Sequence, residues 1–147
     1  IIFIGMIPEG NLSTYRHTTR GQCFAELRRE LGEVLGHASE IWGMTGLAQK
    51  LIPHRIWLNM HKTCRVHTAA EALRFAPLLS TGATIVSELC YYKDQEEYGG
   101  LVQFVPWEHL ASTLNRTMHE ARALDSVANL AGRSTRSQLF MRRFNPS

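Results

Sequence analysis

Short apolar runs rich in β-branched residues recur along the chain and alternate with segments of helical periodicity. Strands are predicted at residues 1–7, 37–42, 55–61, 83–88 and 101–105, and helices at residues 22–35, 68–80, 107–119, 121–131 and 134–143. Runs that are apolar throughout suit strands buried on both faces of a parallel sheet. The alternation therefore predicts an α/β fold, with a Rossmann-like, mostly parallel sheet, helices on both faces and a single domain over residues 1–147.

Glycines and polar runs mark the expected ends of these elements. Gly36 is expected to cap the helix at residues 22–35, because glycine readily adopts the left-handed conformation that ends many helices. Residues 45–52 are expected to form one or two helical turns. The polar residues 90–100, which end in Gly99 and Gly100, are expected to form a loop.

The length and the charge of the chain exclude several classes of protein. A chain of 147 residues buries about 69% of its unfolded surface, which supports a core without disulfides. The net charge of +3 makes nucleic acid an unlikely partner. The excess of basic residues lies near the carboxyl terminus, in Arg133, Arg136, Arg142 and Arg143. These arginines form either a solvated helix face or a contact with a phosphate or a partner.

Cellular location is predicted from apolar runs and cysteines. No apolar run approaches the ~20 residues of a membrane-spanning helix, and no signal-peptide pattern is present. Cys23, Cys64 and Cys90 are odd in number and far apart, without metal-binding spacing. They are expected to be small buried hydrophobes in a reducing compartment, which predicts an intracellular, cytoplasmic protein. The chain begins on an apolar run without methionine, so it is interpreted as a piece of something larger.

Ligands of parallel α/β sheets bind outside the carboxyl ends of the strands. This rule selects the loops at residues 5–21, 59–68 and 87–99. The first loop carries Gly5, Arg16, His17 and Arg20 before a helix. A helix amino terminus with a guanidinium is a phosphate site, although the same residues also fit an ordinary basic surface loop.

The second loop is the richest in polar side chains, with Asn59, His61 and Thr68 following a predicted strand. Thr68 and Glu71 fit a capping box, in which Glu71 reaches back to the helix start. Alternatively, Glu71 accepts hydrogen bonds from ribose hydroxyls while the helix start faces a diphosphate. Arg74 lies one turn further on, either bracing Glu71 or facing a sugar phosphate.

The third loop follows Ser87 and Glu88 at the end of the strand predicted at residues 83–88. Glu88 is expected either to bind sugar hydroxyls or to orient a neighbouring backbone segment, and the alternative is an exposed strand-end residue. No Ser/His/Asp order, paired acids or Cys/His dyad stands out, so no catalytic residue is assigned. His61 and His67 have no third ligand at suitable spacing, so no metal site is expected.

Three segments together resemble a known family. They are Ile56-Trp57-Leu58-Asn59-Met60-His61, the run from His67 to Leu79 with Glu71, Arg74 and Pro77-Leu78-Leu79, and the run from Gly82 to Glu88. They resemble the carboxyl-terminal, nucleotide-sugar-binding domain of B-type glycosyltransferases. The resemblance spans nearly the whole chain, because the runs at residues 3–5 and 101–105 fall where that family places strands.

The resemblance implies that a nucleotide-diphosphate sugar is held at these strand ends, and that its sugar is transferred to an acceptor hydroxyl. No other cofactor is implied, and an amino-terminal acceptor domain or partner protein would supply the base. The implied donor-site residues are Asn59, His61, Thr68, Glu71, Arg74, Ser87 and Glu88, with Arg16 and Arg20 beside them.

A second interpretation is a degenerate, non-catalytic domain of this type that serves as a structural subunit of a larger assembly. Many such transferases carry a pair of glutamates around this helix. Ala69 and Pro77 stand at the corresponding positions here. A nucleotide-binding regulatory module would share the fold but not the three matching segments, and the fold alone does not decide among these functions.

Overall fold

The computed structural model describes residues 1–4, 19–38, 55–61, 72–80 and 82–130. Five strands form one sheet in the order β2-β1-β3-β4-β5. They are β1 (Ile2–Ile4), β2 (Gly36–Ala38), β3 (Ile56–Asn59), β4 (Thr84–Glu88) and β5 (Val102–Val105). Every neighbouring pair is parallel, which confirms the predicted α/β, Rossmann-like sheet.

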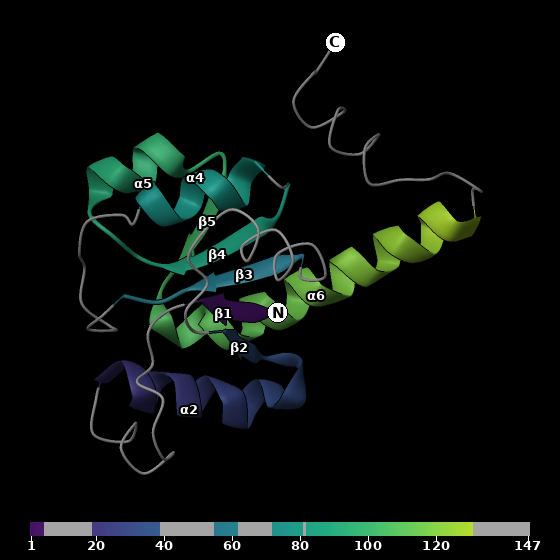
Figure 1. Ribbon diagram of the computed structural model, residues 1–147, viewed down its shortest axis with the longest axis horizontal. Helices are drawn as coiled ribbons and strands as arrows, with labels where there is room; N and C mark the ends of the chain where they lie inside the picture. Colours follow the sequence, from purple (N-terminus) through teal and green to yellow (C-terminus); the bar gives the residue numbers. More distant parts are fainter. Residues whose placement is uncertain (5–18, 39–54, 62–71, 81, 131–147) are drawn as a thin grey trace.

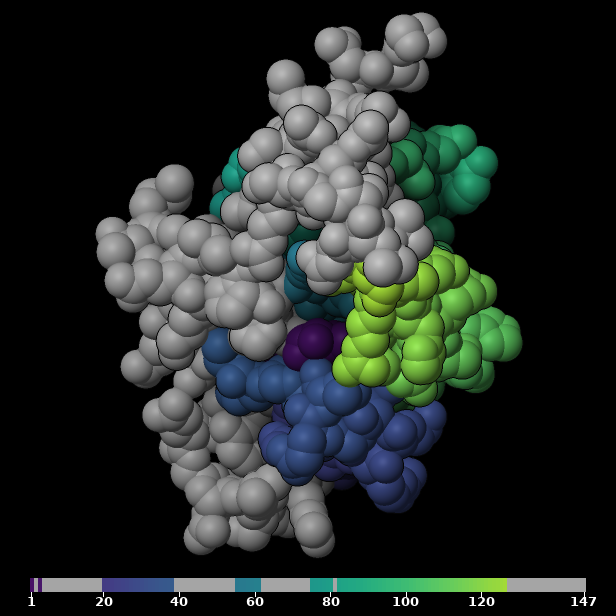
Figure 2. Space-filling view, turned by 90° about the vertical axis from the view of Figure 1, so that its right-hand side faces the viewer, coloured from purple at the N-terminus to yellow at the C-terminus, as the bar shows by residue number. Residues whose placement is uncertain are grey.

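Helices cover both faces of this sheet (Figure 1). The helices are α2 (Thr19–Leu31), α4 (Ala72–Ser80), α5 (Tyr92–Tyr98) and α6 (Trp107–Leu130). A short 3₁₀ helix, η1 (Gly32–Val34), follows α2. Helices α2 and α6 lie on one face, and α4 and α5 lie on the other. Figure 2 shows α2 and α6 side by side on the outside of the molecule.

The core consists of two clusters, because successive strand residues point to opposite faces of a sheet. In β3, Leu58 packs toward α2 and α6, whereas Trp57 packs toward α4. In β4, Val86 and Ile85 divide in the same way. The positions of β3 and β4 that face these two clusters are therefore apolar, and this pattern made the two strands recognisable in the sequence.

The end of α2 differs from the prediction. The α-helix stops at Leu31, and Gly32 takes a positive φ of 65°. Gly36, which was expected to cap the helix, instead begins β2 and donates its backbone N–H to the Ile1 carbonyl at 2.9 Å. Either glycine could cap the helix as judged from the sequence, but only Gly32 has the left-handed conformation that ends it.

Two further predictions about helices are wrong. Residues 92–98 form α5 rather than a loop, and the helices expected at residues 107–119 and 121–131 are one continuous helix, α6. Helix α5 has no buried residue, so its sequence lacks an apolar stripe. In α6 no glycine or proline interrupts the chain. The predicted elements at residues 45–52 and 134–143 lie outside the described residues.

The cysteines are only partly as expected. Cys23 and Cys90 are buried, and Cys90 is a free thiol. Cys23, however, takes part in a disulfide bond, which does not fit the expected reducing compartment. Separation along the sequence does not report distance in the fold, and the cysteines give no support for a reducing compartment. Among the described helices, none is long and apolar enough to cross a membrane.

Candidate functional site

The strand order creates a crossing point at the carboxyl edge of the sheet, between β1 and β3. From β1 the chain runs to β2 on one side, and it then returns to β3 on the other side of β1. The connections that leave β1 and β3 therefore diverge. In doubly wound sheets ligands bind in the crevice formed at such a point. Side chains at the ends of β3 and β4 are thus candidate ligand-binding groups.

Buried polar residues end both of these strands. Asn59 and Ser87 are direct neighbours in the β3–β4 pairing, and both are almost completely buried. The Asn59 Nδ2 donates a hydrogen bond to Ser87 Oγ at 3.0 Å, and Ser87 Oγ donates to the Glu88 carbonyl at 2.9 Å. The pair locks the ends of β3 and β4 together, since burial makes each unmade hydrogen bond costly.

Glu88 is a buried carboxylate that contacts the segment after β3. Its side chain is only 2% exposed, which contradicts the alternative of an exposed strand-end residue. Its Oε2 accepts a hydrogen bond from the backbone N–H of His61 at 2.8 Å. A carboxylate in this position holds the chain at the point where it leaves β3, because hydrogen bonds to charged groups are stronger than neutral ones.

His61 is held from three directions. Besides the Glu88 contact to its N–H, its ring Nε2 lies 3.0 Å from the Leu89 carbonyl. Its own carbonyl accepts a hydrogen bond from Arg20 Nε at 3.0 Å. The residue is 1% exposed, and its ring Nδ1 is a buried side-chain atom without a hydrogen-bond partner in the described part of the chain.

Arg20 joins the first turn of α2 to the end of β3. Its Nη2 donates to the Met60 carbonyl at 3.2 Å, beside the Nε contact to His61. Its guanidinium lies 6.0 Å from the centre of the Phe3 ring, within the range of a cation–π interaction. The arginine thus places positive charge at the crossing point while it caps carbonyls that extend beyond β3.

The structure brings together five of the predicted site residues at this edge: Arg20, Asn59, His61, Ser87 and Glu88. Arg16, Thr68 and Glu71 lie outside the described residues. Arg74 falls within α4, and its side chain is outside the description. The grouping of the five follows the rule that parallel strands end at one edge, and we call them the edge cluster.

The sequence did not reveal the turn after β4, which supports the edge cluster. The Gln95 side chain in α5 donates to the Cys90 carbonyl at 2.6 Å, and the backbone N–H of Gln95 donates to the Tyr91 carbonyl at 3.0 Å. Burial, with a smaller contribution from the charge of Asp94, raises the pKa of the Cys90 thiol. A thiol with a raised pKa is a poor nucleophile, so Cys90 fits a packing role.

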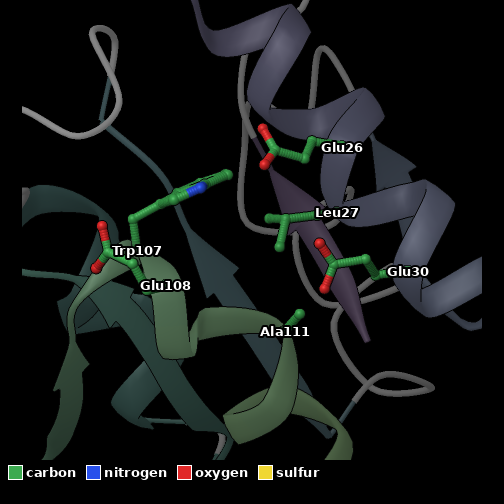
Figure 3. A pocket seen from close by; sticks show the side chains of 6 residues that line it. All are labelled: Glu26, Leu27, Glu30, Trp107, Glu108 and Ala111. Atoms are coloured by element: carbon green, nitrogen blue, oxygen red, sulfur yellow. The ribbon is translucent and has the colours of Figure 1, made fainter.

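A pocket of about 380 Å³ lies elsewhere, between α2 and the first turns of α6. Figure 3 shows the Trp107 indole extending toward α2, where Glu26 and Glu30 line the opposite wall, whereas the Glu108 carboxylate points away from α2. Sequence inspection missed this pocket, although Trp107 follows β5 and so obeys the same strand-end rule. Because the Glu108 carboxylate points away from Glu26 and Glu30, the three carboxylates do not converge on one point, and the pocket is not assigned a ligand.

Within the described ranges, no group of three or more His, Cys, Asp or Glu side chains could hold a metal ion. Comparisons with protein-family models, curated proteins and solved structures gave no match to this chain. The edge cluster and the strand order are therefore the basis for a functional interpretation.

Proposed function

We propose that the chain binds a nucleotide-diphosphate sugar at the carboxyl edge of the sheet and acts as the donor-binding domain of a glycosyltransferase. The observation that carries the proposal is the edge cluster, which gathers buried polar side chains from β3 and β4 and an arginine from α2 at the crossing point of the sheet. Ligand sites of doubly wound sheets lie at such points. The resemblance of the segments at residues 56–61, 67–79 and 82–88 to B-type glycosyltransferases supplies the reaction.

In this reaction an acceptor hydroxyl attacks the anomeric carbon of the donor sugar. The bond from that carbon to the diphosphate oxygen breaks, and its electron pair leaves with the diphosphate. Arg20 and the amino terminus of α2 supply positive charge near this edge, and positive charge stabilises a departing diphosphate. The hydroxyl proton passes to a base on an amino-terminal acceptor domain or partner protein, so we expect the chain alone to bind donor without transferring sugar.

A structural, non-catalytic role is the second candidate, and one observation favours it. Glu88 and Arg20 both use side-chain polar atoms to hold backbone groups of residues 60 and 61. Such contacts stabilise the fold without any ligand. In that case the chain is a degenerate transferase domain that serves as a subunit of a larger assembly.

Thermal unfolding with added nucleotides separates the two candidates. We expect UDP, GDP or ADP, or one of their glucose conjugates, to stabilise the chain by about 2.7 kcal/mol at 100 times its dissociation constant. The stabilisation should be lost in Glu71→Ala and Arg74→Ala, which remove two predicted donor-site side chains. Arg28→Ala is the matched control, because Arg28 pairs with Glu33 on the exposed surface of α2. The absence of a response to any of these nucleotides would favour the structural role.

A further inference from the structure

The unpartnered Nδ1 of His61 is the most unusual polar atom in the described part of the chain. No other described residue has a buried side-chain nitrogen or oxygen without a hydrogen-bond partner. An unsatisfied buried polar atom is destabilising, and native proteins contain few of them. This one lies just past the end of β3, within the edge cluster. This position makes Nδ1 a candidate ligand-binding atom.

The His61 ring cannot relieve this cost by turning. Its Nε2 is engaged with the Leu89 carbonyl at 3.0 Å, and its backbone is fixed at both ends by Glu88 and Arg20. Rotation of the ring would move Nε2 away from the Leu89 carbonyl and break that contact. The direction of Nδ1 is therefore set before any ligand arrives, and preorganised polar groups lose less entropy on binding.

The Leu89 contact also determines what Nδ1 can bind. A carbonyl oxygen only accepts hydrogen bonds, so Nε2 carries a proton. In the neutral form of the ring the lone pair then belongs to Nδ1, which is an acceptor. Phosphate oxygens are acceptors too and do not complement it. The complementary group is a donor, and the donors that a nucleotide sugar offers in greatest number are hydroxyl groups.

We propose that His61 Nδ1 accepts a hydrogen bond from a hydroxyl group of the ligand and thereby selects for hydroxyl-bearing ligands. This inference rests on the proposed function, because the nucleotide sugar supplies the hydroxyl, from either its ribose or its transferred sugar. Sites that are built to hydrogen-bond a hydroxyl discriminate strongly against analogues without it, since the buried partner is then left unpaired. His61 would be a specificity-determining residue of the donor site.

Two substitutions separate the two ring nitrogens. In His61→Gln the side-chain amide can replace Nε2 as the donor to the Leu89 carbonyl, but no acceptor remains at the place of Nδ1. In His61→Asn the amide oxygen can replace Nδ1, and the donor to Leu89 is lost. A purely structural role predicts that His61→Asn is the more damaging change. The proposed role predicts that His61→Gln is the more damaging change for binding.

The experiment is titration calorimetry on the whole chain with UDP-glucose, GDP-glucose and ADP-glucose. We expect the conjugate that binds best to bind His61→Gln about tenfold more weakly, a change of about 1.4 kcal/mol, and His61→Asn to lose less. The same titration with its 2′-deoxy and 3′-deoxy analogues and with the sugar-free diphosphate locates the hydroxyl. The effect of His61→Gln should vanish for the ligand that lacks the group read by Nδ1.

A spectroscopic readout on the unmodified chain covers the case in which a variant fails to fold. In ¹⁵N-histidine NMR, the Nδ1 signal of His61 should have the shift of an unprotonated, non-bonded nitrogen and should move when the ligand binds. Equal affinity of wild type and His61→Gln, or an Nδ1 signal that does not respond, would overturn this inference alone. A wild-type chain that binds none of the three conjugates would overturn the proposed function with it.

Discussion

The side chains of β3 and β4 change in chemistry along each strand. The buried side chains before the last positions are apolar, as in Trp57 and Leu58, and they fill the two core clusters. In the last positions Asn59, Ser87 and Glu88 are just as inaccessible, yet they are polar or charged. Burial at the carboxyl edge thus does not follow from the hydrophobic effect, which favours apolar groups. The difference shows that hydrogen bonds, rather than apolar packing, connect these strand ends to each other and to the segment after β3.

Removing the largest apolar side chain of β3 should have the greatest effect. Trp57 is 1% exposed and packs in the cluster that α4 covers. We expect Trp57→Ala to lower the free energy of unfolding by about 3–5 kcal/mol, because a cavity remains. Urea denaturation measures the change, and Tyr92→Ala, at a 74% exposed position, is the control. Equal losses in the two variants would contradict the core assigned to this face.

A polar residue of the edge cluster should contribute to the free energy of unfolding through its hydrogen bond rather than through the volume that it fills. Glu88→Ala leaves the buried N–H of His61 without its acceptor, which should cost about 1–3 kcal/mol. Glu88→Gln keeps an acceptor oxygen and should cost less. Glu97→Ala, on the exposed surface of α5, should leave stability unchanged. If the urea midpoint of Glu88→Ala equals that of the wild type, the Glu88 carboxylate does not stabilise the end of β3.

The Asn59–Ser87 contact offers a sharper comparison between the apolar positions and the polar strand ends. Asn59→Leu and Ser87→Ala should each destabilise the chain, and the double variant should lose less than the sum of the two. We expect a coupling of about 1 kcal/mol, the usual net value of one hydrogen bond. Denaturation of the four proteins completes the cycle. Strict additivity would mean that the two side chains do not interact in solution.

The smallest effect should come from Cys90 and should appear only at high pH. Burial raises the pKa of its thiol, so the folded state favours the neutral form. The resulting stability is fully present below the ordinary thiol pKa of about 8.5 and is lost as the pH rises above it. The difference in unfolding free energy between wild type and Cys90→Ala should therefore shrink above that pH. A difference that stays constant with pH would refute the raised pKa.

The location of most edge-cluster residues could be predicted from the local sequence pattern, because the carboxyl ends of parallel strands lie at the same edge of the sheet. Asn59, His61, Ser87 and Glu88 each stand directly after an apolar run, so their common location was predictable. Other features left no such trace. Helix α5 has no buried face to mark it, yet its Gln95 donates a hydrogen bond to the Cys90 carbonyl and its Asp94 contributes to the raised pKa of the Cys90 thiol. The pocket beside Trp107 was missed because α2 forms its other wall.

The sequence by itself determined the parallel sheet and its two apolar faces, since strands that are buried on both sides require continuous apolar runs. Only the tertiary structure decided which polar atoms form hydrogen bonds and which have no partner. Arg20 reaches a carbonyl 41 residues away, and the Leu89 carbonyl takes one nitrogen of the His61 ring. Hydrogen bonds depend on distance and direction between atoms, and residue order does not encode these quantities. The unpartnered Nδ1 of His61 could therefore be recognised only in the folded chain.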